Sequence, residues 1–145
     1  MMGNDWRLDM MISTRGRYAL RVLVDLTENG GDRSYIAMKE VAARQNISLK
    51  YLERILPALV HAGFIEGAQG KGGGYRLLAD PHTVTVGQIM RLTEGDLAPV
   101  ACLECGAPVC PRAGECRTLP VWKGLKDVIT GYLDGITLAE VAKNV

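Results

Sequence analysis

The most restrictive feature of this sequence is a glycine-rich stretch, GAQGKGGG, at residues 67–74. Short apolar segments flank it, with Phe64 and Ile65 before it and Tyr75 to Leu78 after it. Glycine adopts positive φ angles without steric cost and lets two backbones approach closely. The pattern therefore predicts a small β-hairpin with a flexible tip.

Three helices are predicted before this hairpin. Ser13 or Thr14 can cap a first helix that runs to about Thr27. A second helix covers roughly residues 38–45, and after a tight turn a third helix begins with Ser48 as its cap. Helix, helix, turn, helix and hairpin is the order of a winged helix-turn-helix. The predicted fold class is mostly α with a small β-hairpin.

A long amphipathic helix is predicted near the C-terminus, where Pro120 suits the first turn. The apolar residues that follow with helical spacing are Val121, Trp122, Leu125, Val128, Ile129, Tyr132 and Leu133. This stripe is wide for so small a body, so we expect it to pack against a partner helix. Another helix is expected over residues 85–93, and Thr137 with Glu140 forms a capping box for a last short helix.

These signals divide the chain into five segments. We expect a winged helix-turn-helix domain followed by a linker helix, a cysteine-rich loop and a dimerisation helix. The boundaries are 1–10 for an N-terminal extension, 11–79 for the DNA-binding domain, 80–99 for the linker, 100–118 for the cysteine loop, and 119–145 for the dimerisation helix and tail.

All four cysteines of the chain lie between Cys102 and Cys116. The first residues hold no continuous apolar stretch of a secretory signal, so a cytoplasmic location is expected, where thiols stay reduced. Clustered cytosolic cysteines are interpreted first as metal ligands or redox groups. Arg112 and Arg117 are expected to help keep nearby thiols deprotonated.

The cysteine spacing narrows the choice of metal. Cys102, Cys105, Cys110 and Cys116 are separated by two, four and five residues, which is not the pair of CxxC motifs of a zinc ribbon. Thiolates suit either zinc or an iron–sulfur cluster, and irregular spacing on a loop with glycine and proline is common for clusters. A redox dithiol made by the single CxxC is a weaker interpretation, because that motif follows no strand of a βαβ unit.

The third helix is the expected recognition helix, because the second helix of such a motif enters the major groove. Its N-terminal residues Ser48, Lys50, Tyr51 and Arg54 are candidates for base and phosphate contacts. Further candidates are Gln69 and Lys71 at the tip of the hairpin, and Arg15 and Arg17 at the entry to the first helix.

The charge of the chain supports DNA binding only in its N-terminal half. The net charge of the whole chain is +1, yet the segment from Ser13 to Arg76 holds ten lysines and arginines against six acidic residues. A basic face is possible there, and a solvated helical surface is the alternative. No apolar run is long enough to span a bilayer, and no catalytic triad, paired carboxylate site or phosphate loop stands out. We therefore expect no membrane, no small-molecule substrate and no enzyme.

Several segments together resemble the Rrf family of winged helix-turn-helix transcription regulators, which includes IscR, NsrR, RirA and CymR types. The matching segments are ISTRGRYALRVLVDL in the first helix, ISLKYLERIL in the recognition helix, GKGGGYRL in the wing, TVGQIMRLTEGDLAPV in the linker helix and VWKGLKDVITGYLDGITLAEV at the C-terminus. The resemblance covers nearly everything after residue 10 and implies a cytoplasmic homodimer on a near-palindromic, double-stranded DNA operator. It also implies that Tyr51, Glu53 and Arg54 contact bases or backbone.

In cluster-binding members of that family, three cysteines hold the cluster, and Cys102, Cys110 and Cys116 match their spacing. The usual fourth ligands are missing here, because Leu119 stands where IscR-like members have a histidine and Arg17 where NsrR-like members have an acid. Cys105 is extra, and either replaces that ligand or is a bystander thiol. All-cysteine ligation suits a 2Fe-2S or a 4Fe-4S cluster.

The function expected from sequence is thus a DNA-binding repressor controlled by an iron–sulfur cluster that senses iron, nitric oxide or redox state. Two rivals stay open. In one, zinc or a cluster is purely structural, and in the other the cysteines form a thiol-based redox sensor.

Overall fold

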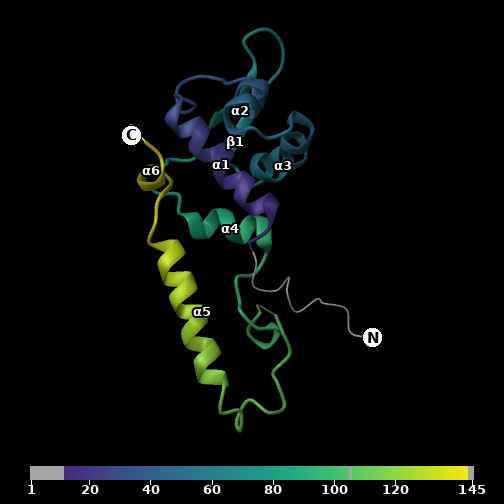
Figure 1. The fold of residues 1–145 in the computed structure, drawn as a ribbon, viewed down its shortest axis with the longest axis vertical. Helices are drawn as coiled ribbons and strands as arrows, with labels where there is room; N and C mark the ends of the chain where they lie inside the picture. The colour runs from purple at the N-terminus through teal and green to yellow at the C-terminus, as the bar shows by residue number, and fades with distance from the viewer. Residues whose placement is uncertain (1–11, 105, 144–145) are drawn as a thin grey trace.

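The computed structural model describes residues 12–104 and 106–143, so the expected extension at residues 1–10 and Cys105 lie outside the described residues. Figure 1 shows a winged-helix body at one end and a long helix with an irregular loop reaching away from it. In chain order the elements are α1 (Thr14–Glu28), α2 (Met38–Gln45), α3 (Leu49–His61), β1 (Ile65–Ala68), β2 (Gly74–Leu77), α4 (Val86–Glu94), η2 (Ala101–Leu103), α5 (Leu119–Asp134) and α6 (Leu138–Val141). The predicted fold class is confirmed.

Side-chain caps set the helix starts. The Ser13 hydroxyl accepts a hydrogen bond from the Gly16 N–H at the start of α1, and Ser48 accepts one from the Tyr51 N–H at the start of α3. Such caps satisfy N–H groups that have no partner within the helix. Both predicted caps are confirmed, as is the capping box of Thr137 with Glu140 at α6.

The hairpin pairs β1 with β2 in an antiparallel register, with Ile65 opposite Leu77. A third piece of backbone completes it, because Ile36 and Tyr75 exchange two N–H to O=C hydrogen bonds of 2.9 Å each. Gly74 has a positive φ of 145°, and a Cβ atom there would overlap the carbonyl oxygen of Ile36. Glycine is therefore required where the wing crosses this backbone.

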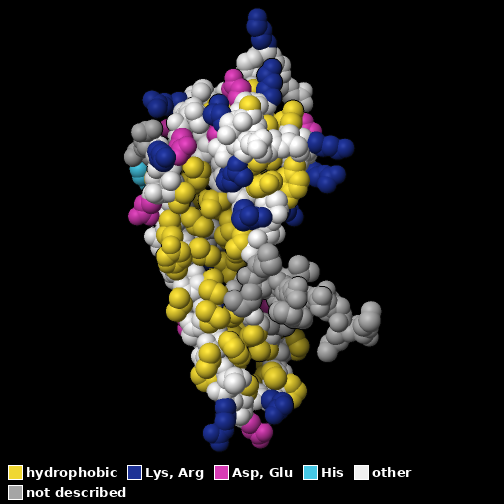
Figure 2. All heavy atoms as spheres, in the orientation of Figure 1, with side chains coloured by type: hydrophobic (Ala, Val, Ile, Leu, Met, Phe, Trp, Pro, Cys, Tyr) yellow, Lys and Arg dark blue, Asp and Glu magenta, His cyan; other side chains and the backbone are white. Residues whose placement is uncertain are grey.

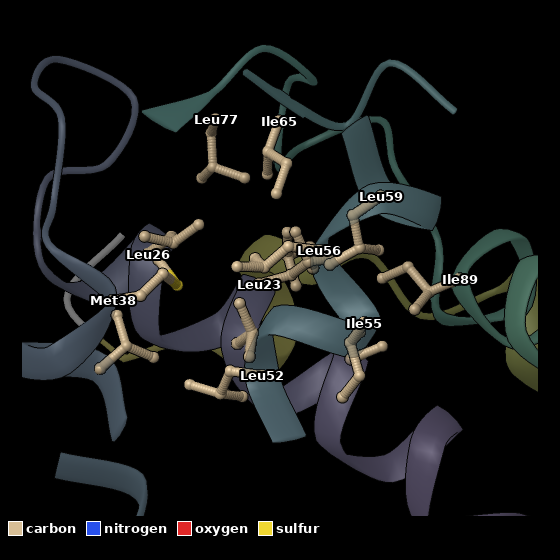
Figure 3. Close-up of a cluster of buried hydrophobic side chains, with 14 of the residues drawn as sticks. Leu23, Leu26, Met38, Leu52, Ile55, Leu56, Leu59, Ile65, Leu77 and Ile89 are labelled. Atoms are coloured by element: carbon tan, nitrogen blue, oxygen red, sulfur yellow. The ribbon is translucent and has the colours of Figure 1, made fainter. Parts of the chain in front are cut away.

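One hydrophobic core holds the winged-helix body together (Figure 3). Its fully buried members come from α1, α2, α3, β1, α4 and α6. They are led by Leu23, Leu26, Leu52, Ile55, Leu59, Ile65 and Ile89. Burying a side chain of this size contributes about 1.5–3 kcal/mol relative to leaving it in water. α3 is thus fixed by its apolar face, and its opposite face is left to solvent.

The two C-terminal helices behave differently. α5 begins at the far end of the loop and runs back toward α4 (Figure 1), and none of its residues is buried. α6 returns to the core, where Leu138 is buried and its N–H donates to the Val84 carbonyl at 2.8 Å. Arg91 of α4 also pairs with Asp134 at the end of α5 at 2.5 Å. Among the described helices, none combines the length and the apolar character needed to cross a bilayer.

Candidate DNA-binding surface and cysteine loop

The exposed face of α3 carries the predicted recognition residues. Ser48, Lys50, Glu53 and Arg54 are exposed and Tyr51 is half-buried. They occupy the N-cap and the first two turns, where a recognition helix meets base edges. The structure therefore brings the five predicted residues of this helix onto one accessible stretch.

Leu49 is a further candidate on this surface that sequence reasoning missed. It begins α3 and is 39% exposed among these polar neighbours. An apolar side chain at this point suits the methyl group of thymine in the major groove. Its exposure depends on the rotation of α3 about its own axis relative to the core. The spacing of apolar residues in the sequence does not define this rotation at the first residue of the helix.

The wing lies beside the C-terminal end of α3. A hollow between them is lined by Val60 of α3 and by Gln69, Gly74 and Tyr75 of the hairpin. Gln69 and the tip residue Lys71 are both exposed. Figure 2 shows lysine and arginine side chains gathered around this winged-helix end of the molecule.

An ion pair supports the wing from its outer side. Arg76 pairs with Glu66 across the two strands, and the Tyr35 hydroxyl donates to the same carboxylate at 3.0 Å. The Arg76 guanidinium, and then the Tyr35 hydroxyl, hold the pKa of Glu66 below its ordinary value. Because both side chains stay more than a third exposed to solvent, the effect of this pair on stability is small.

Arg15 and Arg17 lie in the first turn of α1, and both side chains are exposed. Arg17 donates to the Thr14 hydroxyl at 3.1 Å. Ser13, the cap of this helix, bonds to Glu94 at the end of α4 through its N–H at 3.0 Å and its hydroxyl at 2.5 Å. The two arginines are thus carried by a helix end that is tied directly to the start of the cysteine loop.

The segment that contains the cysteine loop leaves α4 at Gly95 and reaches α5 at Leu119. Cys102 is exposed, Cys110 and Cys116 are half-buried, and Cys105 lies outside the described residues. Over residues 12–104 and 106–143, no three His, Cys, Asp or Glu side chains converge in a way that could hold a metal ion. The structure therefore does not bring Cys102, Cys110 and Cys116 together.

The chemistry of these donors nevertheless fits a soft metal. The Thr118 hydroxyl lies 3.4 Å from the Cys116 sulfur, and this hydrogen bond is the main reason that the pKa of Cys116 lies below its ordinary value. Backbone N–H groups of Thr118 and Leu119 and the charge of Arg112 lower this pKa further. The predicted effect of Arg112 is confirmed for this thiol, whereas Arg117 is not among the groups that lower its pKa. A thiolate is the form that binds metals and reacts with oxidants.

Comparison with known proteins identifies relatives along almost the whole chain. Residues 12–144 match the family model described as "Rrf2: Iron-dependent Transcriptional regulator". The chain is 35% identical over 135 residues to protein rrf2 of Nitratidesulfovibrio vulgaris, covering 93% of this chain and 89% of that protein. It is 31% identical to the HTH-type transcriptional regulator IscR of Escherichia coli, covering 93% of this chain and 82% of the relative.

Solved structures of related regulators superpose on almost the whole chain. The structure of CymR, the global cysteine regulator of B. subtilis, superposes with a TM-score of 0.74 at 32% identity, covering 93% of this chain and 98% of CymR. IscR of T. potens superposes with a TM-score of 0.70 at 30% identity, covering 93% of this chain and 88% of that one.

The contact between Thr118 and Cys116 yields a pH prediction. In a chain whose other cysteines are changed to serine, Thr118→Val should raise the pKa of Cys116, because the hydrogen bond that stabilises the thiolate is lost. The pH profile of alkylation by iodoacetamide should then move to higher pH, and alkylation near neutral pH should slow. Thr118→Ser is the matched control and should keep the original profile. Superimposable profiles for the valine variant and its parent would contradict the assignment.

Proposed function

The chain belongs to the Rrf2 family of transcription regulators, and on this premise we propose that it is a repressor whose operator binding is controlled by an iron–sulfur cluster. The observation that carries the proposal is the union of two features in one chain. A helix with an exposed polar face sits in a winged helix-turn-helix, and a loop rich in cysteine is joined to it by α4 and α5.

In the proposed complex α3 enters the major groove. Arg54 can form two hydrogen bonds to a guanine, Lys50 can bond a base or a phosphate, and Ser48 and Tyr51 can bond phosphate. Gln69 and Lys71 at the wing tip would contact the neighbouring groove, and Arg15 and Arg17 the backbone. Glu53 can accept from the amino group of a cytosine.

A second copy of the chain would cover α5. Val121, Val128 and Tyr132 are at least 59% exposed in the single chain, and Trp122 beside them is 36% exposed. Figure 2 shows hydrophobic side chains along the part of the molecule where α5 and the loop lie. Exposed apolar faces of this kind mark association surfaces. A symmetric dimer presents two recognition helices to the two halves of a near-palindromic operator.

Cys102, Cys110 and Cys116 would hold the cluster, and Cys105 is our candidate for its fourth ligand. Leu119 and Arg17 stand at the positions of the other known ligands and cannot serve. The bound cluster would supply a group that iron loss, nitric oxide or oxidation can alter. Because metal binding commonly organises its own ligands, a loop whose cysteines lie apart is compatible with this role.

One contact joins the loop to α5, and two further contacts join α4, the helix before the loop, to α5 and to the start of α1. The Lys126 ammonium of α5 donates to the Leu103 carbonyl at 2.8 Å, beside Cys102. Arg91 of α4 pairs with Asp134 of α5, and Glu94 accepts hydrogen bonds from Ser13 at the start of α1. A change in the loop would therefore act on α5 and on the first helix of the DNA-binding domain together.

Thiol sensing is the second candidate, and the lowered pKa of Cys116 favours it. CymR, a similar structure, is described as a cysteine regulator, and CymR of Staphylococcus aureus is known in an oxidised form. A colourless protein without iron, in which oxidation of the cysteines changes DNA binding, would support this candidate. Stoichiometric zinc would instead support a purely structural metal.

The DNA-binding proposal predicts that removing the Arg54 side chain lowers operator affinity mainly through one base pair of the operator. Arg54→Ala should weaken binding to an operator selected from random DNA by about 1–3 kcal/mol, concentrated at one base pair. Arg54→Lys is the control, because lysine keeps the charge and loses the two-pronged geometry. If Arg54 reads a base, lysine should not restore binding in a fluorescence anisotropy titration. Equal weakening on every sequence, together with restoration by lysine, would mark Arg54 as a phosphate contact.

The cluster proposal predicts distinct outcomes for two cysteines. Anaerobically purified protein should contain iron and sulfide and absorb in the visible range, and Cys110→Ala should lose all three signals. Cys105→Ala should lose them only if Cys105 is the fourth ligand, so this variant decides the question that the sequence leaves open. A brown, fully loaded Cys110→Ala protein would overturn the ligand assignment.

A further inference from the structure

A network of polar side chains surrounds the end of α2, where the chain turns into the recognition helix. Its centre is Asp25 of α1, which is 1% exposed. Arg44 donates to both oxygens of this carboxylate at 2.7–3.2 Å, and the Gln45 amide donates to one of them at 2.9 Å. A buried carboxylate is tolerated only when it is paired in this way. The network therefore fixes the last turn of α2 against α1.

Arg21 extends this network on the outside. Its guanidinium donates to the Gln45 side-chain oxygen at 3.1 Å and also to the Gln45 backbone carbonyl. The same guanidinium lies 5.3 Å from the centre of the Tyr18 ring. Arg21 is exposed, and one planar group thus serves two acceptors on α2 and an aromatic ring on α1.

The contacts of Arg21 hold both sides of the helix-turn-helix turn. Gln45 ends α2, Asn46 follows with a left-handed φ of 53°, and Ser48 caps α3. On the far side of the turn, Tyr51 of α3 packs edge-on against Tyr18 with ring centres 5.2 Å apart. Arg21 therefore bonds to the residue before the turn and touches the ring that positions the residue after it.

We propose that Arg21 is a positioning residue for operator recognition, which sets the N-terminal end of α3 through Gln45 and Tyr18. This inference rests on the proposed function, since it concerns how α3 is presented to DNA. Arg21 acts through these two side chains and makes no contact with a phosphate. A small displacement of Tyr51 and Arg54 should reduce discrimination between DNA sequences more than it reduces general affinity for DNA. Contacts to bases carry the sequence information, whereas contacts to phosphates only fix the orientation of the protein on the duplex.

The guanidinium geometry makes the proposal testable by conservative exchange. Lysine keeps the positive charge, but its ammonium cannot present two parallel donors to Gln45 in a fixed plane. Methionine keeps the apolar stem and removes every donor. If Arg21 works through Gln45, both exchanges should have similar effects. If it works by charge alone, lysine should behave like the parent protein.

The experiment measures discrimination between the selected operator and a scrambled duplex, by anisotropy over a range of salt concentrations. Arg21→Met and Arg21→Lys should each lower operator affinity by about tenfold, within the usual range of coupling for contacting residues. Affinity for the scrambled duplex and its salt dependence should stay unchanged. In the double variant Arg21→Met with Gln45→Met, the loss should be no larger than in the more affected single variant.

Controls separate this effect from a loss of fold or of charge. Arg33, on the turn after α1, has a side chain that is 85% exposed and is paired with its neighbour Asp32. Arg33→Met removes the same charge and should leave discrimination unchanged. Thermal unfolding of the Arg21 variants should stay close to that of the parent, since the buried Asp25 and its partner Arg44 keep their mutual contacts.

Two results would overturn the inference. One is a loss shared by both duplexes, with a salt slope smaller by about 1 and rescue by lysine, which would identify a phosphate contact. The other is additivity of the Arg21 and Gln45 losses, which would show that the two residues act independently. If the parent protein itself does not discriminate between the duplexes, the proposed DNA-reading function fails. If the parent discriminates and both Arg21 variants do so equally well, only the inference on Arg21 fails.

Discussion

The return of α6 to the winged-helix core is the constraint on which the rest of the molecule depends. Leu138 is buried in the core that also anchors the recognition helix, and the backbone on either side of Thr137 bonds to residues 84–86. Besides this return, α5 is held to the winged-helix body by the Arg91–Asp134 pair and by Leu133, which packs against the core. Because its C-terminal end is fixed at these points, we expect a tilt of α5 to displace α4 or the body as a whole.

Away from α6, α5 contacts the cysteine loop. The helix begins three residues after Cys116, and Lys126 in its middle donates to the Leu103 carbonyl, so the loop contacts the helix that we assign to the dimer interface. The Ser13 to Glu94 contact supplies a second route, from the end of α4 to the first turn of α1. The proposed signal therefore needs no movement inside the apolar core, which is densely packed and resists small displacements. Rigid elements meeting at polar contacts can transmit it.

Local signals predicted the elements well. Serine and threonine caps, the bounds of α2 and the glycine-rich hairpin depend on a few neighbouring residues, so they could be interpreted from the chain alone. The pairing of Ile36 with Tyr75, the Arg21 to Gln45 contact and the Lys126 to Leu103 contact could not, because each joins residues distant in sequence through backbone or side-chain geometry. The exposure of the candidate residues at the start of α3 follows from its helical pattern, whereas their contacts with DNA stay a prediction. The grouping of the cysteines stays a prediction, since Cys102, Cys110 and Cys116 lie apart in the described residues.

The central claim is that the chemical state of the cysteine loop changes the affinity for DNA. The most direct test is to titrate one operator with cluster-loaded protein and with the same preparation after anaerobic removal of the cluster. A ligand can shift a conformational equilibrium only by its differential affinity for the two states, so a cluster that controls the regulator must give two different dissociation constants. We expect the two forms to differ by about five-fold or more, the lower end of typical allosteric coupling. Identical dissociation constants, with the cluster shown to be present in one form and absent in the other, would contradict the account.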